Sequence, residues 1–160
     1  MNRFLFPLTA LLCCVINQSL QGQNLKVEKM GDKLATQAIT LNPEYLVFYP
    51  AAKTTEPVPL VIYLHGAGGV GDEILKIKGQ AGQIARGISQ NKKTPCLVVA
   101  PQVSRKNRQP GGWIPSHLNL FLKHLKNSLN LDDNRIYLTG NSMGGYGSWT
   151  WGGLDPEHFS

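Results

Sequence analysis

Two uninterrupted apolar runs constrain the fold of this chain more than any other feature. Residues 60–64 read Leu-Val-Ile-Tyr-Leu, and residues 96–100 read Cys-Leu-Val-Val-Ala. A strand with one face in water alternates apolar and polar residues, whereas a strand covered on both faces is apolar throughout. The first run ends at His65-Gly66 and the second at Pro101, which are residue types that end strands. The two runs therefore predict central strands of a parallel sheet that is covered by helices on both faces.

Further elements fit the same architecture. Residues 45–49, bounded by Pro43 and Pro50, and residues 135–139 are predicted strands. Residues 72–90 carry apolar residues at helical spacing, but three glycines among them favour an irregular helical crossover. Ser116 is expected to cap a helix that ends near Asn130, and residues 143–151 form a second predicted helix. Strands alternating with helices in this order predict an α/β fold with a doubly wound, mostly parallel sheet in one domain, residues 23–160.

The first 22 residues are predicted to be a secretory signal peptide. A positive charge at Arg3 precedes an apolar run at residues 4–16, a polar segment follows, and Gly22 is a plausible cleavage site. The apolar run is shorter than the roughly 20 residues that a membrane-spanning helix needs. The bulky leucines before Cys13 and Cys14 argue against lipid attachment at either cysteine. We therefore expect a secreted or periplasmic protein without stable membrane insertion after cleavage.

The remaining cysteine and the net charge exclude other kinds of protein. Cys96 is the only cysteine after residue 22, so no internal disulfide is expected, and its place in an apolar run predicts a packed thiol. The net charge of +6 is spread along the chain, with one cluster at Arg105, Lys106 and Arg108 beside Pro110. This cluster is interpreted as a solvated loop. Because no nucleic-acid-binding motif accompanies it, no nucleic-acid partner is expected.

One motif indicates catalysis. Gly140-Asn141-Ser142-Met143-Gly144 has the pattern Gly-x-Ser-x-Gly between a predicted strand and a predicted helix. In such a turn the serine hydroxyl projects outward, and glycines two residues before and after it avoid steric collision. The N–H groups at the start of the following helix favour a developing negative charge. Ser142 is therefore the predicted nucleophile, and the Met143 N–H is the predicted first donor of an oxyanion hole.

A glycine-rich loop follows the strand at residues 60–64 and supports this interpretation. It reads His65-Gly66-Ala67-Gly68-Gly69, and the backbone N–H of Ala67 or of Gly66 is the predicted second oxyanion donor. His65 is expected to order the loop by hydrogen bonding rather than to act as a base. This chemistry needs no metal and no cofactor.

Four runs together resemble the α/β-hydrolase superfamily: LHGAGGVGDE, VVAPQ, GGW and DDNRIYLTGNSMGGYGSW. Within it, the chain is most similar to secreted carboxylesterases of the phospholipase/carboxylesterase, feruloyl esterase or polyhydroxybutyrate depolymerase type, and to related predicted peptidases. The resemblance covers residues 45–160. It implies hydrolysis of a small-molecule or polymer-borne ester through an acyl-enzyme on Ser142. It also implies that Trp113 flanks the substrate cleft, although a tryptophan after two glycines fits the edge of the core equally well.

The sequence departs from this superfamily after the motif. The superfamily order is serine, acid, histidine, yet only Asp155, Glu157 and His158 follow Ser142 as candidates. The helix at residues 143–151 is expected to carry His158 away from the hydroxyl, and His117 and His124 are expected to be structural. We therefore interpret the chain as the N-terminal part of such a domain, truncated after the helix that follows Ser142, nearly inactive alone and with an unpaired edge on strand 135–139. An exported serine peptidase of the prolyl-oligopeptidase type and a non-catalytic or vestigial fragment remain alternatives.

Overall fold

The structure, a computed structural model, describes residues 24–51, 53–91 and 94–160. The predicted signal peptide, with Cys13 and Cys14, lies outside the described residues. Among the helices that are described, none is both long and apolar enough to cross a membrane.

Five strands form one sheet in the order β1-β2-β4-β3-β5. β3 is parallel to both β4 and β5, whereas β2 is antiparallel to β1 and to β4. This arrangement confirms the mostly parallel sheet that was predicted. The strands are β1 (Asn24–Lys29), β2 (Glu44–Tyr49), β3 (Val58–Leu64), β4 (Leu97–Ala100) and β5 (Leu131–Gly140).

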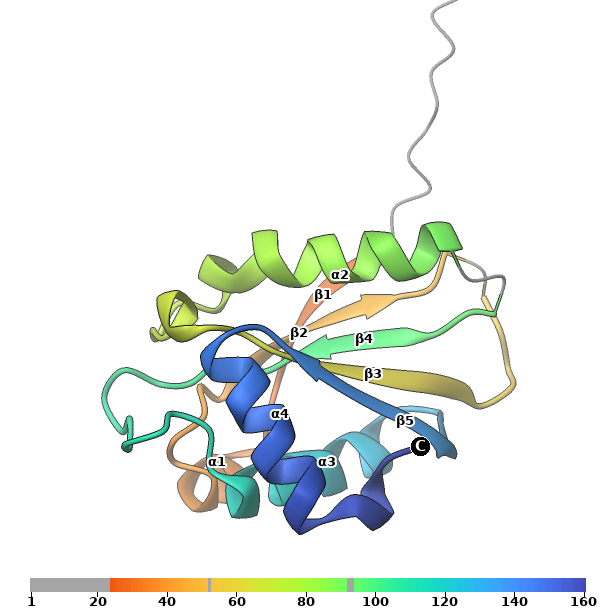
Figure 1. Ribbon diagram of the computed structural model, residues 1–160. Coiled ribbons are helices and arrows are strands. Elements are labelled where there is room, and N and C mark those ends of the chain that lie inside the picture. The colour runs from red at the N-terminus through yellow and green to blue at the C-terminus, as the bar shows by residue number, and fades with distance from the viewer. Residues whose placement is uncertain (1–23, 52, 92–93) are drawn as a thin grey trace, which may run out of the picture.

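Helices cover both faces of the sheet, as the continuous apolar runs require. In Figure 1, α2 (Lys78–Asn91) lies above the sheet, while α1 (Asp32–Gln37), α3 (Pro115–Ser128) and α4 (Met143–Leu154) lie below it. Successive residues of β3 divide between the two cores. Leu60, Ile62 and Leu64 pack in the core with α3 and α4, whereas Tyr63 packs in the core with α2. Short 3-10 turns at Ala67–Gly69, Ile74–Ile77 and Pro156–His158 complete the described elements.

Several boundaries differ from the sequence predictions. β1 and α1 were not predicted, because β1 is a largely exposed edge strand and α1 has no buried residue to give an apolar stripe. The prediction that Ser116 caps α3 was wrong. The helix begins at Pro115 and makes no side-chain capping bond, and proline suits this position because it has no N–H to leave unpaired. The crossover is more regular than expected, since α2 runs through all three of its glycines.

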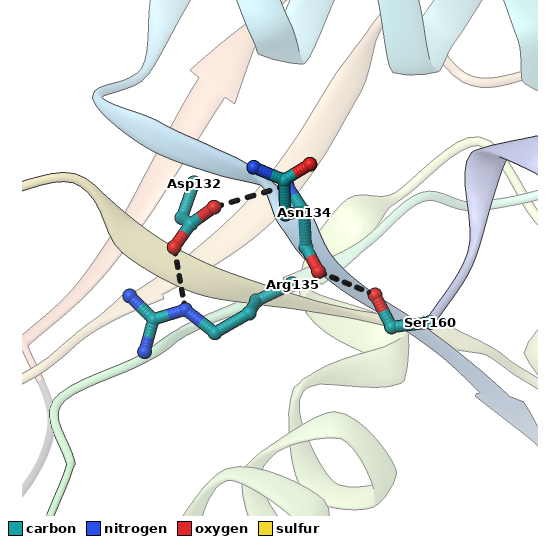
Figure 2. A network of polar contacts seen from close by, with 4 residues as sticks. All are labelled: Asp132, Asn134, Arg135 and Ser160. Atoms are coloured by element: carbon teal, nitrogen blue, oxygen red, sulfur yellow. Dashed lines mark hydrogen bonds and ion pairs between the residues drawn. The ribbon is translucent and has the colours of Figure 1, made fainter.

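The beginning of β5 is held by polar contacts that its composition did not reveal. Figure 2 shows the Asp132 carboxylate accepting hydrogen bonds from the Asn134 N–H, at 3.0 Å, and from Arg135 Nε. The Ser160 hydroxyl donates to the Asn134 carbonyl oxygen at 2.7 Å, and the Ser160 N–H donates to the Ile136 carbonyl oxygen at 2.9 Å. The strand therefore starts at Leu131 rather than near residue 135, and Ser160 lies alongside its first half.

Two histidines of α3 have the structural role that was predicted. His117 Nδ1 lies 2.7 Å from Thr40 Oγ1, and His124 Nε2 lies 3.0 Å from the Tyr45 hydroxyl. Burial, with a contribution from the charge of Glu28, raises the pKa of Tyr45 to about 12, so this phenol stays protonated. These bonds tie α3 to β2 and to the segment before it.

The remaining cysteine is packed as the sequence predicted. Cys96 is 8% exposed and belongs to the core beneath α2. Burial raises the pKa of its thiol, which keeps the reactive thiolate scarce.

Glycines let α4 lie directly on the sheet. A β-carbon added at Gly144 would overlap the carbonyl oxygen of Leu64, and one added at Gly147 would lie 2.6 Å from Trp113 Cδ1. By contrast, a β-carbon at the neighbouring Gly145 would meet only the Gly140 carbonyl oxygen, at an ordinary 3.6 Å. The close contact between α4 and β3 therefore requires a glycine at position 144 but not at position 145.

This difference predicts opposite effects of one substitution at neighbouring positions. Gly144→Ala is expected to lower the free energy of unfolding by about 1–3 kcal/mol, because the clash is with backbone that cannot rotate away. Gly145→Ala is expected to leave stability unchanged or to raise it by up to about 1 kcal/mol, because alanine favours helix. Urea unfolding followed by circular dichroism measures both values. Equal stability of the two variants would contradict the packing described here.

Candidate active site

The turn at Ser142 has the backbone geometry that the motif predicted. Ser142 has φ 50° and ψ −118°, and it is the one non-glycine residue with positive φ in the described part of the chain. Such a conformation costs on the order of 1–3 kcal/mol, and the surrounding packing must impose it. The residue stands between the end of β5 and the first turn of α4, and it is exposed. The structure therefore presents the Ser142 side chain to solvent on a strained turn.

The glycine-rich loop after β3 lies against this turn. A β-carbon added at Gly66 would lie 2.5 Å from Asn141 Oδ1 and 3.5 Å from Ser142 Cβ. The loop is closed by two backbone hydrogen bonds, from the Gly69 N–H to the Gly66 oxygen and from the Val70 N–H to the Ala67 oxygen. A larger residue at position 66 would require the Asn141 side chain to move.

Three backbone donors lie in the two segments that meet at Ser142. Among the described residues, the N–H groups of Met143, Gly66 and Ala67 have no hydrogen-bond acceptor. Met143 is also the first residue of α4, where the helix dipole is positive. The structure thus brings together the three groups that the sequence assigned to an oxyanion hole, and their role in binding an oxyanion stays a prediction.

His65 is fully buried, and both of its ring nitrogens are occupied by backbone groups. The Val103 N–H donates to Nε2 at 3.0 Å, so Nε2 carries no proton and Nδ1–H donates to the Gly66 carbonyl oxygen at 2.7 Å. Burial lowers the pKa of His65 to about 4, the Gly66 bond opposes this, and the charge of Lys76 adds to it. The neutral ring therefore joins the loop after β3 to the segment after β4. This confirms the loop-ordering role and leaves no nitrogen free to serve as a base.

Trp113 is one of the residues that the structure places in the core. The side chain is 4% exposed, its ring centroid lies 4.8 Å from that of His65, and its indole N–H donates to the His65 carbonyl oxygen at 3.2 Å. It also packs on Gly147 of α4. Of the two interpretations left open by the sequence, this position fits the core edge, and Trp113 fixes the loop and α4 against each other.

No described histidine is placed to act on Ser142. His65, His117 and His124 have the partners given above, and the fourth, His158, follows α4. The 12 residues of α4 carry the chain about 18 Å from the turn, at roughly 1.5 Å per residue. Ser160, two residues later, is bonded to Asn134 and Ile136, the fourth and sixth of the ten residues of β5, whereas Ser142 follows the end of that strand. His158 therefore belongs to the opposite edge of the sheet.

Aromatic side chains that the sequence reasoning did not single out lie next to Ser142. Gly145, Tyr146 and Trp149 form a shallow depression with it. Tyr146 is 80% exposed and Trp149 is 85% exposed, although both belong to a helix that the sequence correctly predicted. The even spread of apolar residues around this helix gave no sign of which side would be buried. In the described residues no group of three or more metal-ligating side chains comes together.

The burial of His65 predicts a pH dependence of stability. The folded pKa of about 4 lies below the unfolded value of about 6.5, so the unfolded chain takes up the proton more readily and stability falls as the pH drops through this interval. Between pH 7.5 and pH 5 the protonation of His65 alone should lower the free energy of unfolding by about 2 kcal/mol. Urea unfolding of the parent chain and of His65→Gln, each at pH 7.5 and at pH 5, measures this contribution. A variant with the full pH dependence of the parent chain would show that His65 is not the titrating group.

Comparisons with known proteins show which solved structures this chain is similar to. No family model and no curated protein matches the sequence. A solved thermostable esterase is 26% identical, with a TM-score of 0.61 over 88% of this chain. An S-formylglutathione hydrolase from Agrobacterium tumefaciens is 24% identical, with a TM-score of 0.59 over 89% of the chain. A protein of Bacteroides ovatus assigned as a dipeptidyl aminopeptidase IV is 17% identical, with a TM-score of 0.63 over 89% of the chain.

The chain spans only part of each of these structures: 40% of the esterase, 57% of the S-formylglutathione hydrolase and 21% of the Bacteroides protein. Over that part, the neighbours share its mostly parallel sheet and flanking helices. The expectation from the sequence is confirmed at the level of the fold, and the chain is an α/β-hydrolase-like chain similar to known esterases.

Proposed function

We propose that Ser142 is the nucleophile of a carboxylic ester hydrolase. The observation that carries the proposal is the strained turn at Ser142, with the unpaired N–H groups of Met143, Gly66 and Ala67 beside it. The Ser142 hydroxyl attacks the ester carbonyl carbon, and the carbonyl oxygen becomes an oxyanion that accepts hydrogen bonds from Met143 and from Gly66 or Ala67. A base takes the Ser142 proton and gives it to the leaving alcohol, so that an acyl-enzyme remains on Ser142. Water then hydrolyses the acyl-enzyme, which releases the carboxylic acid and restores the Ser142 hydroxyl.

The mechanism needs a base that the described residues do not supply. A base must take the Ser142 proton, and an acidic residue must orient that base. His65 is committed to two backbone bonds, and His158 lies at the other edge of the sheet. In a studied serine protease, loss of the catalytic histidine lowers turnover by about a million-fold. The proposal therefore requires a base and an acid from polypeptide outside residues 24–160, and these residues alone should be nearly inactive.

An exported serine peptidase is the second candidate. The similarity to the Bacteroides protein assigned as a dipeptidyl aminopeptidase IV, with a TM-score of 0.63, keeps this candidate open. The described site suits both reactions, because both pass through the same type of oxyanion. They differ in the leaving group: an amine needs stronger protonation than an alcohol. The esterase is preferred because, of the three structures named above, the esterase has the highest sequence identity, 26% against 24% and 17%.

Covalent labelling tests the role of Ser142. In the protein expressed from its full reading frame, a fluorophosphonate probe is expected to label the parent chain, and Ser142→Ala is expected to remove the label. Ser148→Ala is the matched control. Ser148 lies in the same helix, where its hydroxyl donates to the Gly144 carbonyl oxygen, so this variant should be labelled like the parent.

Labelling that survives in Ser142→Ala would place the nucleophile elsewhere, and a parent protein that is never labelled would favour a non-catalytic chain. Rates on matched ester and anilide substrates then separate the two candidates. An esterase should hydrolyse the ester at least about a hundredfold faster. Comparable rates would indicate the peptidase, because only an enzyme built to protonate an amine overcomes that difference.

A further inference from the structure

A basic loop stands at the same edge of the sheet as Ser142. It consists of residues 105–108, carries the exposed side chains of Arg105, Lys106 and Arg108, and belongs to the segment that joins β4 to α3. The carboxyl ends of the parallel strands β3, β4 and β5 meet at this edge, which is where ligands bind in open α/β sheets. In Figure 1 the segment extends beyond the end of β4, on the side where β5 turns into α4.

Contacts at both ends fix the basic loop to the candidate site. At its beginning, the Ser104 hydroxyl and the Arg105 N–H both donate to Asp72 Oδ1, at 2.8 and 3.0 Å. Four residues after the basic loop, Gly112 has φ 79°, and a β-carbon there would lie 2.5 Å from Met143 Sδ. The segment thus runs from the loop after β3 to the residue that follows Ser142.

The charges along this segment are unbalanced. Lys76 lies in the 3-10 turn after the β3 loop, where its Nζ donates a hydrogen bond to the Val70 carbonyl oxygen at 2.7 Å, so we do not count it with the basic loop. Asp72 and Glu73 are the acidic residues in the same stretch, residues 70–76. Neither of the two ion pairs found among the described residues involves the basic loop. Hydrogen bonding from Ser104, with a contribution from Lys106, lowers the pKa of Asp72, so this group is already ionised and engaged.

We propose that the basic loop binds carboxylates of the substrate, so that the ester hydrolysed at Ser142 is carried by a molecule with several carboxylate groups. This inference rests on the proposed function and specifies its substrate class. Arginine side chains bind carboxylates in a bidentate manner, and a surface with an excess of one sign of charge attracts ligands of the opposite sign. Nucleic-acid binding is a less favoured alternative, because a nucleic-acid-binding surface carries more basic residues than the three of this loop.

Binding tests the basic loop without relying on catalysis. The probes are trigalacturonate and the neutral xylotriose, measured by isothermal titration calorimetry on the protein expressed from its full reading frame. The variant Arg105→Gln/Lys106→Gln/Arg108→Gln is expected to weaken trigalacturonate binding about tenfold. The control Lys33→Gln/Arg86→Gln/Lys123→Gln removes the same charge from exposed positions on α1, α2 and α3 and should change binding less than twofold.

Salt supplies a second readout, because the Debye length falls from about 10 Å at 0.1 M to about 3 Å at 1 M salt. Trigalacturonate binding should weaken with salt in the parent and control proteins, and much less in the loop variant. Equal loss of binding in the two triple variants would overturn the proposal, and so would xylotriose binding as tight as that of trigalacturonate. Tighter binding of a single-stranded oligonucleotide of equal charge would overturn it in favour of a nucleic acid.

Kinetics separate a failure of this inference from a failure of the proposed function. Acetylated oligogalacturonate and acetylated xylo-oligosaccharide are the matched substrates. The ratio of their kcat/KM values, acidic over neutral, should fall about tenfold in the loop variant, through KM for the acidic substrate. An unchanged ratio with Ser142-dependent hydrolysis of both substrates would overturn the inference alone. Absence of Ser142-dependent hydrolysis on either substrate would overturn the proposed function, while the binding result still decides whether the loop holds carboxylates.

Discussion

The backbone of α4 lies so close to the end of β3 that no side chain fits between them, and the rest of the candidate site depends on this contact. A β-carbon at Gly144 would overlap the Leu64 carbonyl oxygen, and a β-carbon at Gly140 would overlap the Gly144 carbonyl oxygen. With the strand end and the helix start held this close, the single residue between Asn141 and Met143 must reverse the chain. Ser142 therefore adopts its positive φ because of the packing around it, and the strain is retained for as long as the sheet and α4 stay together.

The same contact organises the loops around Ser142. β3 ends beneath α4, so the loop after β3 reaches Ser142 through Gly66, while the neutral ring of His65 fastens that loop to Val103 after β4. Trp113 then closes the arrangement between His65 and Gly147. The buried His65 ring and the buried Trp113 ring thus help to set the positions of the exposed groups around Ser142.

Particular residues show what the sequence reveals and what it leaves out. The apolar runs predict β3 and β4, because a strand that is buried on both faces is apolar at every position and stands out in the sequence. The Gly-x-Ser-x-Gly spacing predicts the turn at Ser142, because only small residues permit so close an approach. The edge strand β1 escapes prediction, since it is mostly exposed and its stability comes from pairing with β2. The position of the basic loop also escapes prediction, because it depends on contacts of Asp72 and Met143 with residues more than 30 positions away along the chain.

The most direct test of the account is a crystal structure of the protein expressed from its full reading frame, with an alkyl phosphonate bound covalently to Ser142. The phosphonyl oxygen occupies the position of the oxyanion in the reaction. We predict that it lies about 2.7–3.1 Å from the Met143 nitrogen and at the same distance from the nitrogen of Gly66 or Ala67. A phosphonyl oxygen directed into solvent, with these N–H groups still unpaired, would contradict the central claim that the packing of α4 on β3 assembles an oxyanion site around Ser142.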